Sequence, residues 1–148
     1  MMTGCNKASV PDQLAAAERH FKNDNYESAE IEYLNVLRVE PKNLTALAKL
    51  GVISQRQGQL AKALAILQRT KSNDLNNVEV RRALALTYVT VHQLDKAREE
   101  SEFVLQIVPD DADAVYVLVD ASRQPAERES ARQRLESLLR SSGEKPQY

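Results

Sequence analysis

The feature of this sequence that most constrains its fold is an alanine that recurs at intervals of 34 residues. The four positions are Ala29, Ala63, Ala97 and Ala131. Other positions repeat in the same register: four residues after each alanine stand Tyr33, Leu67, Ser101 and Leu135, and twelve residues before it stand Ala17, Gly51, Ala85 and Val119. Self-similarity at a fixed period of this length is typical of arrays of small structural units.

Each unit divides into two helical stretches of about three turns, joined by a short polar turn such as residues 22–25 or 56–59. A small residue in the first stretch and the alanine in the second let two antiparallel helices approach closely, while larger side chains fill the grooves between units. One hairpin of this kind cannot bury its apolar stripe alone. The pattern therefore predicts a stack of helical hairpins.

Three segments add motifs to this register: YESA (26–29), LG (50–51) and GQLAKA (58–63). With these motifs the sequence resembles the tetratricopeptide repeat (TPR) family. The resemblance implies an all-α fold, a right-handed solenoid of about four TPR helix-turn-helix units. The expected organisation is a leader or tether at 1–9, a solenoid at 10–145 with units 10–43, 44–77, 78–111 and 112–145, and a tail at 146–148.

Two units depart from the pattern. Unit two ends in a polar segment at 70–75 and lacks the closing proline, so we expect its second helix to be short and its contact with unit three to be the weakest. In unit four, Pro125 falls near the expected end of the first helix, and Arg128 replaces a large apolar residue at the start of a second helix expected at 127–140. That helix is either a solvated end cap or the point where a longer array is interrupted. Asp12 and Asp111 are expected to cap helices.

The sequence carries no pattern that points to catalysis. It has no Gly-rich phosphate loop and no G-x-S-x-G motif, and neither His20 nor His92 has a second histidine or a cysteine at helical spacing. We therefore predict a protein that is not an enzyme, with no catalytic residues, no metal and no cofactor. Basic and acidic residues number 20 and 21 and are interleaved, so no nucleic-acid partner is expected.

The resemblance also implies a binding surface, because in the TPR family the first helices of successive units line the concave face. The partner-binding residues expected from it are Leu14, Glu18, Phe21, Lys22, Ala48, Val52, Gln55, Arg56, Arg82, Leu86, Val89, Thr90, Tyr116, Asp120, Arg123 and Gln124. This row mixes apolar residues with three arginines that would pair with partner carboxylates, which suits a peptide or an amphipathic helix. The alternative is that Val52, Leu86 and Val89 merely pack between repeats. Leu14 and Glu18 stand where the chaperone-binding members have Lys and Asn, which disfavours that partner.

The N-terminal segment Thr3-Gly4-Cys5 resembles the end of a bacterial lipoprotein signal, with Cys5 as the lipidation candidate, although Met2 stands where Leu is usual. This interpretation places the protein in the periplasm or envelope, with contact to a membrane only through the lipid. The alternative is a cytoplasmic protein with an incidental cysteine.

These observations favour a non-catalytic scaffold or adaptor that binds another protein in the concave groove and helps to assemble an envelope complex. One alternative is the substrate-docking segment of a longer enzyme or regulatory protein. A third is self-association through the end helices.

Overall fold

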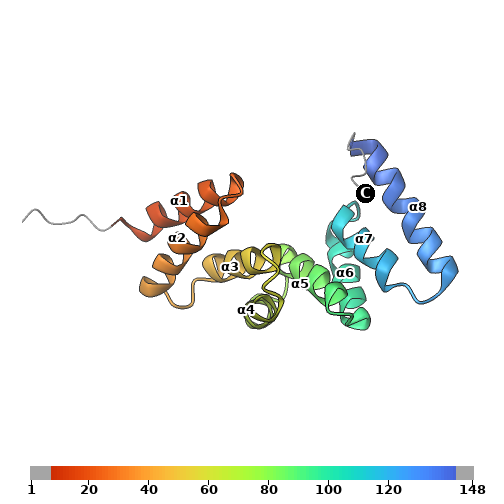
Figure 1. The fold of residues 1–148 in the computed structure, drawn as a ribbon, viewed down its shortest axis with the longest axis horizontal. Helices are drawn as coiled ribbons and strands as arrows, with labels where there is room; N and C mark the ends of the chain where they lie inside the picture. Colours follow the sequence, from red (N-terminus) through yellow and green to blue (C-terminus); the bar gives the residue numbers. More distant parts are fainter. Residues whose placement is uncertain (1–7, 143–148) are drawn as a thin grey trace, which may run out of the picture.

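A computed structural model describes residues 8–142 of the chain, and within this range it contains eight α-helices and no strands. In chain order they are α1 (Val10–Lys22), α2 (Tyr26–Val39), α3 (Leu44–Arg56), α4 (Leu60–Asn73), α5 (Val78–Thr90), α6 (Leu94–Ile107), α7 (Ala112–Ala121) and α8 (Pro125–Ser142), shown in Figure 1. Cys5, the leader up to residue 7 and the tail at 146–148 lie outside the described residues. No described helix is long and apolar enough to cross a membrane.

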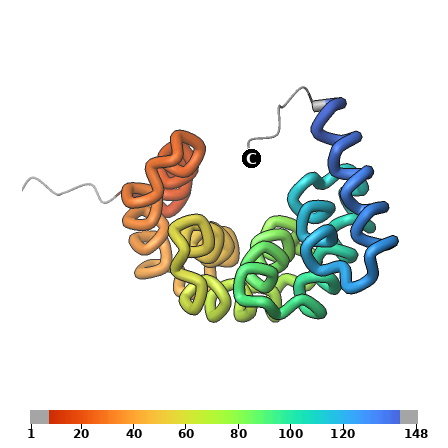
Figure 2. The backbone as a smooth tube through the Cα atoms, turned by 45° about the vertical axis from the view of Figure 1, so that its right-hand side comes forward, coloured from red at the N-terminus to blue at the C-terminus, as the bar shows by residue number. Residues whose placement is uncertain are grey.

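The helices form four consecutive pairs, α1/α2, α3/α4, α5/α6 and α7/α8, and each second helix also contacts the first helix of the next pair. Stacked in this way, the pairs describe an arc with α1/α2 at one end and α7/α8 at the other (Figure 2). The all-α, right-handed solenoid of TPR-like helix pairs that the sequence predicts is confirmed.

The repeated small residues lie where helices approach most closely. Ala29, Ala63 and Ala97 are completely buried on α2, α4 and α6. Gly51 on α3 faces Leu67 so closely that a Cβ atom at Gly51 would lie 2.5 Å from Leu67 Cδ2. The spacing between paired helices is therefore set by residues with little or no side chain, as the sequence pattern predicts.

Helix ends repeat with the same 34-residue period. The first helix of every pair is capped by the side chain of Ser9, Asn43, Asn77 or Asp111, each of which accepts a hydrogen bond from the backbone N–H three residues later. The prediction of a cap at Asp111 is confirmed. The prediction for Asp12 is wrong, because Ser9 is the cap and Asp12 completes a capping box with it.

The first three pairs also turn in the same way. Asp24, Gly58 and His92 adopt left-handed backbone angles, with φ of 55°, 72° and 60°. The N–H of the residue after each donates to the carbonyl five residues earlier, at 2.8–2.9 Å, which is the Schellman ending of a helix. The equivalent position in the fourth pair is Ala126, which lies inside α8. The link between α7 and α8 is consequently of a different kind.

Three further expectations from the sequence are wrong. The contact between units two and three is not the weakest, because both α3 and α4 contact α5, whereas α2 alone makes a comparable contact with α3. Helix α4 is not short: it has 14 residues, as have α2 and α6. Its polar end is accommodated because Thr70, Ser72 and Asn73 donate side-chain hydrogen bonds to the carbonyls four residues earlier. Pro125 does not end α7 but begins α8, a position where proline needs no hydrogen-bonded N–H.

Candidate functional site

The candidate binding surface is the inner side of the arc. Helix α3 contacts α5, and α5 contacts α7, whereas α2, α4, α6 and α8 make no comparable contacts with one another in the described part of the chain. Helices that approach one another in a curved stack occupy its shorter, inner side (Figure 2). The candidate residues on α1, α3, α5 and α7 therefore belong to the inner layer. Arg123 and Gln124 do not, because α7 ends at Ala121.

Several apolar residues of the expected row contribute to the core. Ala48 and Val52 are buried, and Leu86 and Val89 pack against the same cluster while remaining partly exposed. Leu14 and Phe21 pack in the same manner against a separate core cluster, which is formed by buried residues of α1, α2 and α3. The alternative stated above, packing between repeats, therefore describes Val52 well.

A network of charged side chains connects the first three inner helices. Glu18 on α1 lies 3.7 Å from both Lys22 and Lys49, and Lys49 on α3 lies 2.8 Å from Glu79 on α5. The Tyr33 hydroxyl donates to Glu18 at 3.1 Å. Burial raises the pKa of Tyr33, and the Glu18 carboxylate raises it further, so the hydroxyl remains a donor. Lys49 and Glu79 were not selected from the sequence. Lys49 stands three residues before Val52, and Glu79 three residues before Arg82, so each lies on the same helix face as a selected residue.

The three arginines that were expected to pair with carboxylates of a partner already lie beside carboxylates of this chain. Arg82 Nε donates to Asp111 at 2.6 Å, so it supports the residue that caps α7. Arg123 pairs with Asp95 at 2.8 Å, at the start of α6. Arg56 donates to the Tyr26 hydroxyl, lies 3.8 Å from Asp24, and its side chain remains about half exposed.

A small cavity lies on the inner face between α3, α5 and α7. It has a volume of about 90 Å³ and is lined by Val52, Gln55, Arg56, Glu79, Arg82, Ala83, Leu86 and Asp113. Five of these residues come from the expected row, so the structure does bring that part of the row together. The volume is well below the 300–1,000 Å³ of a small-molecule site. The cavity fits a single side chain with charges of both signs around it.

The C-terminal end of the inner face is acidic and carries an exposed aromatic residue. Tyr116 on α7 is 43% exposed, and the negative charge of Asp120 raises its pKa. Both residues belong to the expected row, and one turn of α7 separates them.

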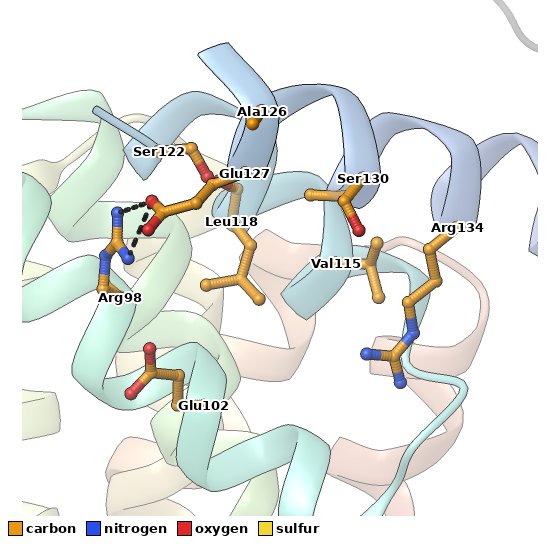
Figure 3. A pocket seen from close by; sticks show the side chains of 10 residues that line it. Arg98, Glu102, Val115, Leu118, Ser122, Ala126, Glu127, Ser130 and Arg134 are labelled. Atoms are coloured by element: carbon orange, nitrogen blue, oxygen red, sulfur yellow. Dashed lines mark hydrogen bonds and ion pairs between the residues drawn. The ribbon is translucent and has the colours of Figure 1, made fainter. Parts of the chain in front are cut away.

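A second hollow, which the sequence did not predict, separates α8 from α6 and α7 (Figure 3). It has a volume of about 490 Å³ and is lined by Arg98, Glu102, Val115, Leu118, Ser122, Ala126, Glu127, Ser130, Ala131 and Arg134. At its rim, Arg98 donates to Glu127 at 3.3 Å and to the Ala121 carbonyl at 3.1 Å. Its lining contains no nucleophile paired with a base. Among the described residues no three His, Cys, Asp or Glu side chains are grouped to hold a metal ion.

Comparison with known families gives a match to the family described as "TT21 fifth ARM repeats domain", over residues 12–108. No curated protein matches the sequence.

Solved structures with this fold are numerous. An O-GlcNAc transferase mutant from Thermobaculum terrenum superposes on 95% of this chain with a TM-score of 0.77 at 22% identity, and this chain spans only 27% of that one. YrrB, described as a TPR protein with an unusual peptide-binding site, gives a TM-score of 0.69 at 22% identity, covering 91% of this chain and 70% of YrrB. A TPR protein of Thermus thermophilus gives 0.73 at 16% identity, covering 89% and 74%.

Proposed function

The chain belongs to the helical-repeat family of the TT21 fifth ARM repeats domain, and from that premise we propose that it is a non-catalytic scaffold that binds a segment of another protein along its inner face. The observation that carries the proposal is the continuity of this face. Three inner helices are linked by one charge network, with a side-chain-sized cavity between α3, α5 and α7. Repeat proteins use such extended inner surfaces for binding.

The chemistry of the face defines the segment that fits it. The cavity takes one apolar side chain of the ligand against Val52 and Leu86. Beside it, Arg56 pairs with an acidic residue of the ligand and Glu79 with a basic one. At the α7 end, Tyr116 and Asp120 add an aromatic surface and a negative charge, which favour a basic residue. The proposed ligand is an extended peptide or helix with one apolar anchor between charged residues. YrrB, which shares the fold, is described as having a peptide-binding site.

A peptide library tests this proposal. Peptides selected on the wild-type protein are measured by titration calorimetry against Leu86→Asp and Arg56→Glu, each of which is expected to weaken binding roughly tenfold or more, since both change the cavity wall. The matched control is Gln68→Glu on the outer side of α4, which should bind as the wild type does. Circular dichroism establishes that each variant is folded. Equal affinity for all four proteins would place the site elsewhere.

A second candidate function is the docking segment of a longer enzyme. It is favoured by the match to an O-GlcNAc transferase of which this chain spans about a quarter. An immunoblot of the native protein in its own cells distinguishes the candidates. A band near 16.6 kDa supports the free-standing scaffold, and a much larger band supports the docking segment.

Membrane attachment through Cys5 is a further part of the proposal and rests on the Thr3-Gly4-Cys5 segment alone. A lipid-bearing protein partitions into detergent, and the Cys5→Ser variant should remain in the aqueous phase. If wild type and variant both remain aqueous in a bacterial host, the envelope assignment fails while the scaffold role stands.

A further inference from the structure

Helix α2 exposes an apolar stripe that the repeat does not require. Ile31 is 59% exposed and Leu34 is 44% exposed, whereas Ala29, Tyr33 and Val36 form the buried side of the same helix. Glu27 and Arg38, also exposed, extend the same stripe at its two ends. The spacings of four, three and four residues keep all four side chains on one face over about 16 Å of helix.

The other second helices provide an internal comparison, because the positions equivalent to the stripe can be read from the 34-residue register. On α4 they are Ala61, Ala65, Gln68 and Ser72; on α6 they are Asp95, Glu99, Glu102 and Gln106; on α8 they are Glu129, Gln133, Glu136 and Arg140. None of these is a large apolar residue. Ile31 and Leu34 are therefore not part of the packing that all units share, and exposed apolar residues grouped on one face typically mark a contact surface.

The charges at the ends of the stripe indicate what the contact surface fits. Within residues 8–142 neither Glu27 nor Arg38 has an ion-pair partner, and the only hydrogen bond of the Arg38 side chain is a donation to Asn35 at 3.2 Å. Glu27 and Arg38 lie at equal distances along the chain from the midpoint between Ile31 and Leu34. A stripe with this order is complementary to a reversed copy of itself.

We propose that two copies of this chain associate through antiparallel α2 helices. In this pairing Ile31 of one copy lies against Leu34 of the other, and Glu27 lies opposite Arg38 at both ends. A two-fold contact of this kind uses the same patch on both subunits. The inner face and its cavity remain open, because the stripe lies on a different side of α2 from its contact with α3.

The small apolar area sets the strength of the association. Two apolar residues per copy, flanked by exposed ion pairs, make a contact below the size of a permanent dimer interface. The dimer is therefore weak and forms as the protein concentration rises. Screening of the end pairs makes it weaker at high salt.

Sedimentation velocity over a wide concentration range tests the association directly. The wild-type mass is expected to rise from 16.6 kDa toward twice that value, and Leu34→Glu should remain a monomer throughout. The matched control is Gln68→Glu, the same repeat position on α4, which should dimerise as the wild type does. A wild-type mass that stays at the monomer value at all concentrations, or a Leu34→Glu variant that still dimerises, overturns the proposal.

The antiparallel register has its own test. Glu27→Arg and Arg38→Glu alone each replace two attractions by two repulsions and should raise the dissociation constant roughly tenfold, whereas the double variant restores both attractions and the wild-type constant. In a Cys5→Ser background, a mixture of Ile31→Cys and Leu34→Cys proteins treated with oxidised glutathione should form mixed disulfide dimers in preference to either homodimer. Failure of the double variant to restore association, or a preference for homodimers, rules out this register.

Discussion

The first six helices and the last two come from the same repeat but are held together by different interactions. In α2, α4 and α6 the repeat alanine is fully buried against its partner helix. In α8 the equivalent Ala131 is only partly buried and lines a hollow of about 490 Å³. Leu135 is the one apolar side chain of α8 that is buried among the described residues. The same register therefore yields a close-packed helix pair in one region and an open one in the other.

Arginines replace the missing apolar contacts at the C-terminal end. Arg98 Nη2 donates to the Ala121 carbonyl and Arg128 to the Ser122 carbonyl, at 3.1 and 2.9 Å, and Arg134 donates to the Pro109 carbonyl. These bonds secure the end of α7 and the connection to α8. Two of these bonds are partly buried and the third is exposed, and a single hydrogen bond adds only about 0.5–1.5 kcal/mol to stability. The comparison teaches that the stack depends on apolar burial, and that α8 is the part that opens most readily.

The largest expected difference concerns buried charge. Glu100 on α6 is 3% exposed and bridges Lys71 and Arg81, so Glu100→Ala leaves a buried arginine without its carboxylate and should cost about 3–5 kcal/mol. Glu127→Ala breaks the Arg98 pair at the rim of the hollow, where both side chains are at least partly exposed, and should cost less than about 1 kcal/mol. Urea unfolding gives both free energies. Similar losses in the two variants would remove the distinction between the regions.

The next test truncates a leucine at the same repeat position in both regions. Leu67→Ala on α4 removes a completely buried side chain and should lower the free energy of unfolding by about 2–5 kcal/mol. Leu135 on α8 is 9% exposed and has no other buried apolar side chain of its own helix beside it among the described residues, so Leu135→Ala should cost less than half as much. Thermal and denaturant unfolding measure the pair. An equal or larger loss at Leu135 would mean that α8 is as well packed as α4.

Enlarging the repeat alanine should have opposite effects in the two regions. Ala97→Leu overpacks α5 against α6 and should cost about 1–3 kcal/mol. Ala131→Leu places the same side chain into the hollow that Leu118 also lines and should leave the melting temperature unchanged or raise it. An unchanged melting temperature for Ala97→Leu would contradict the repeat register itself.

The smallest effect is expected at the N-terminal end of the stack and depends on pH. Hydrogen bonds from the Ser9 hydroxyl and the Ser9 N–H lower the pKa of Asp12 from its usual 3.8. The carboxylate therefore contributes stability above that usual value and loses it as the pH falls through the lowered pKa. Wild type should melt slightly higher than Asp12→Asn near neutral pH, and the two should converge in strong acid. A constant difference at every pH would show that the charge is not what matters.

Much of the fold follows from the sequence because its determinants are local and periodic. Ala29, Ala63 and Ala97 gave the register, and the confirmed fold class rests on it. The same period could have identified the caps Ser9, Asn43 and Asn77. The left-handed turns were less accessible, because Asp24, Gly58 and His92 share a backbone conformation but no side-chain chemistry.

The candidate site was harder to predict than the fold. Periodicity indicates which helix a residue belongs to, and hence the inner layer, but not which charges are satisfied within the chain. Arg82 was expected to meet a partner and instead holds Asp111. The hollow beside α8 depends on where α7 ends, and neither Pro125 nor Arg128 specifies that end without the three-dimensional packing.

Native-state hydrogen exchange tests the central claim most directly, because it measures the opening of each helix separately. The packing predicts that amides of α8 exchange through a low-energy opening, while amides of α3, α4, α5 and α6 exchange together in an opening close to global unfolding. Equal protection of α8 and α4 would contradict the account, since it would show that the polar attachment of the last helix is as strong as the apolar packing of the others.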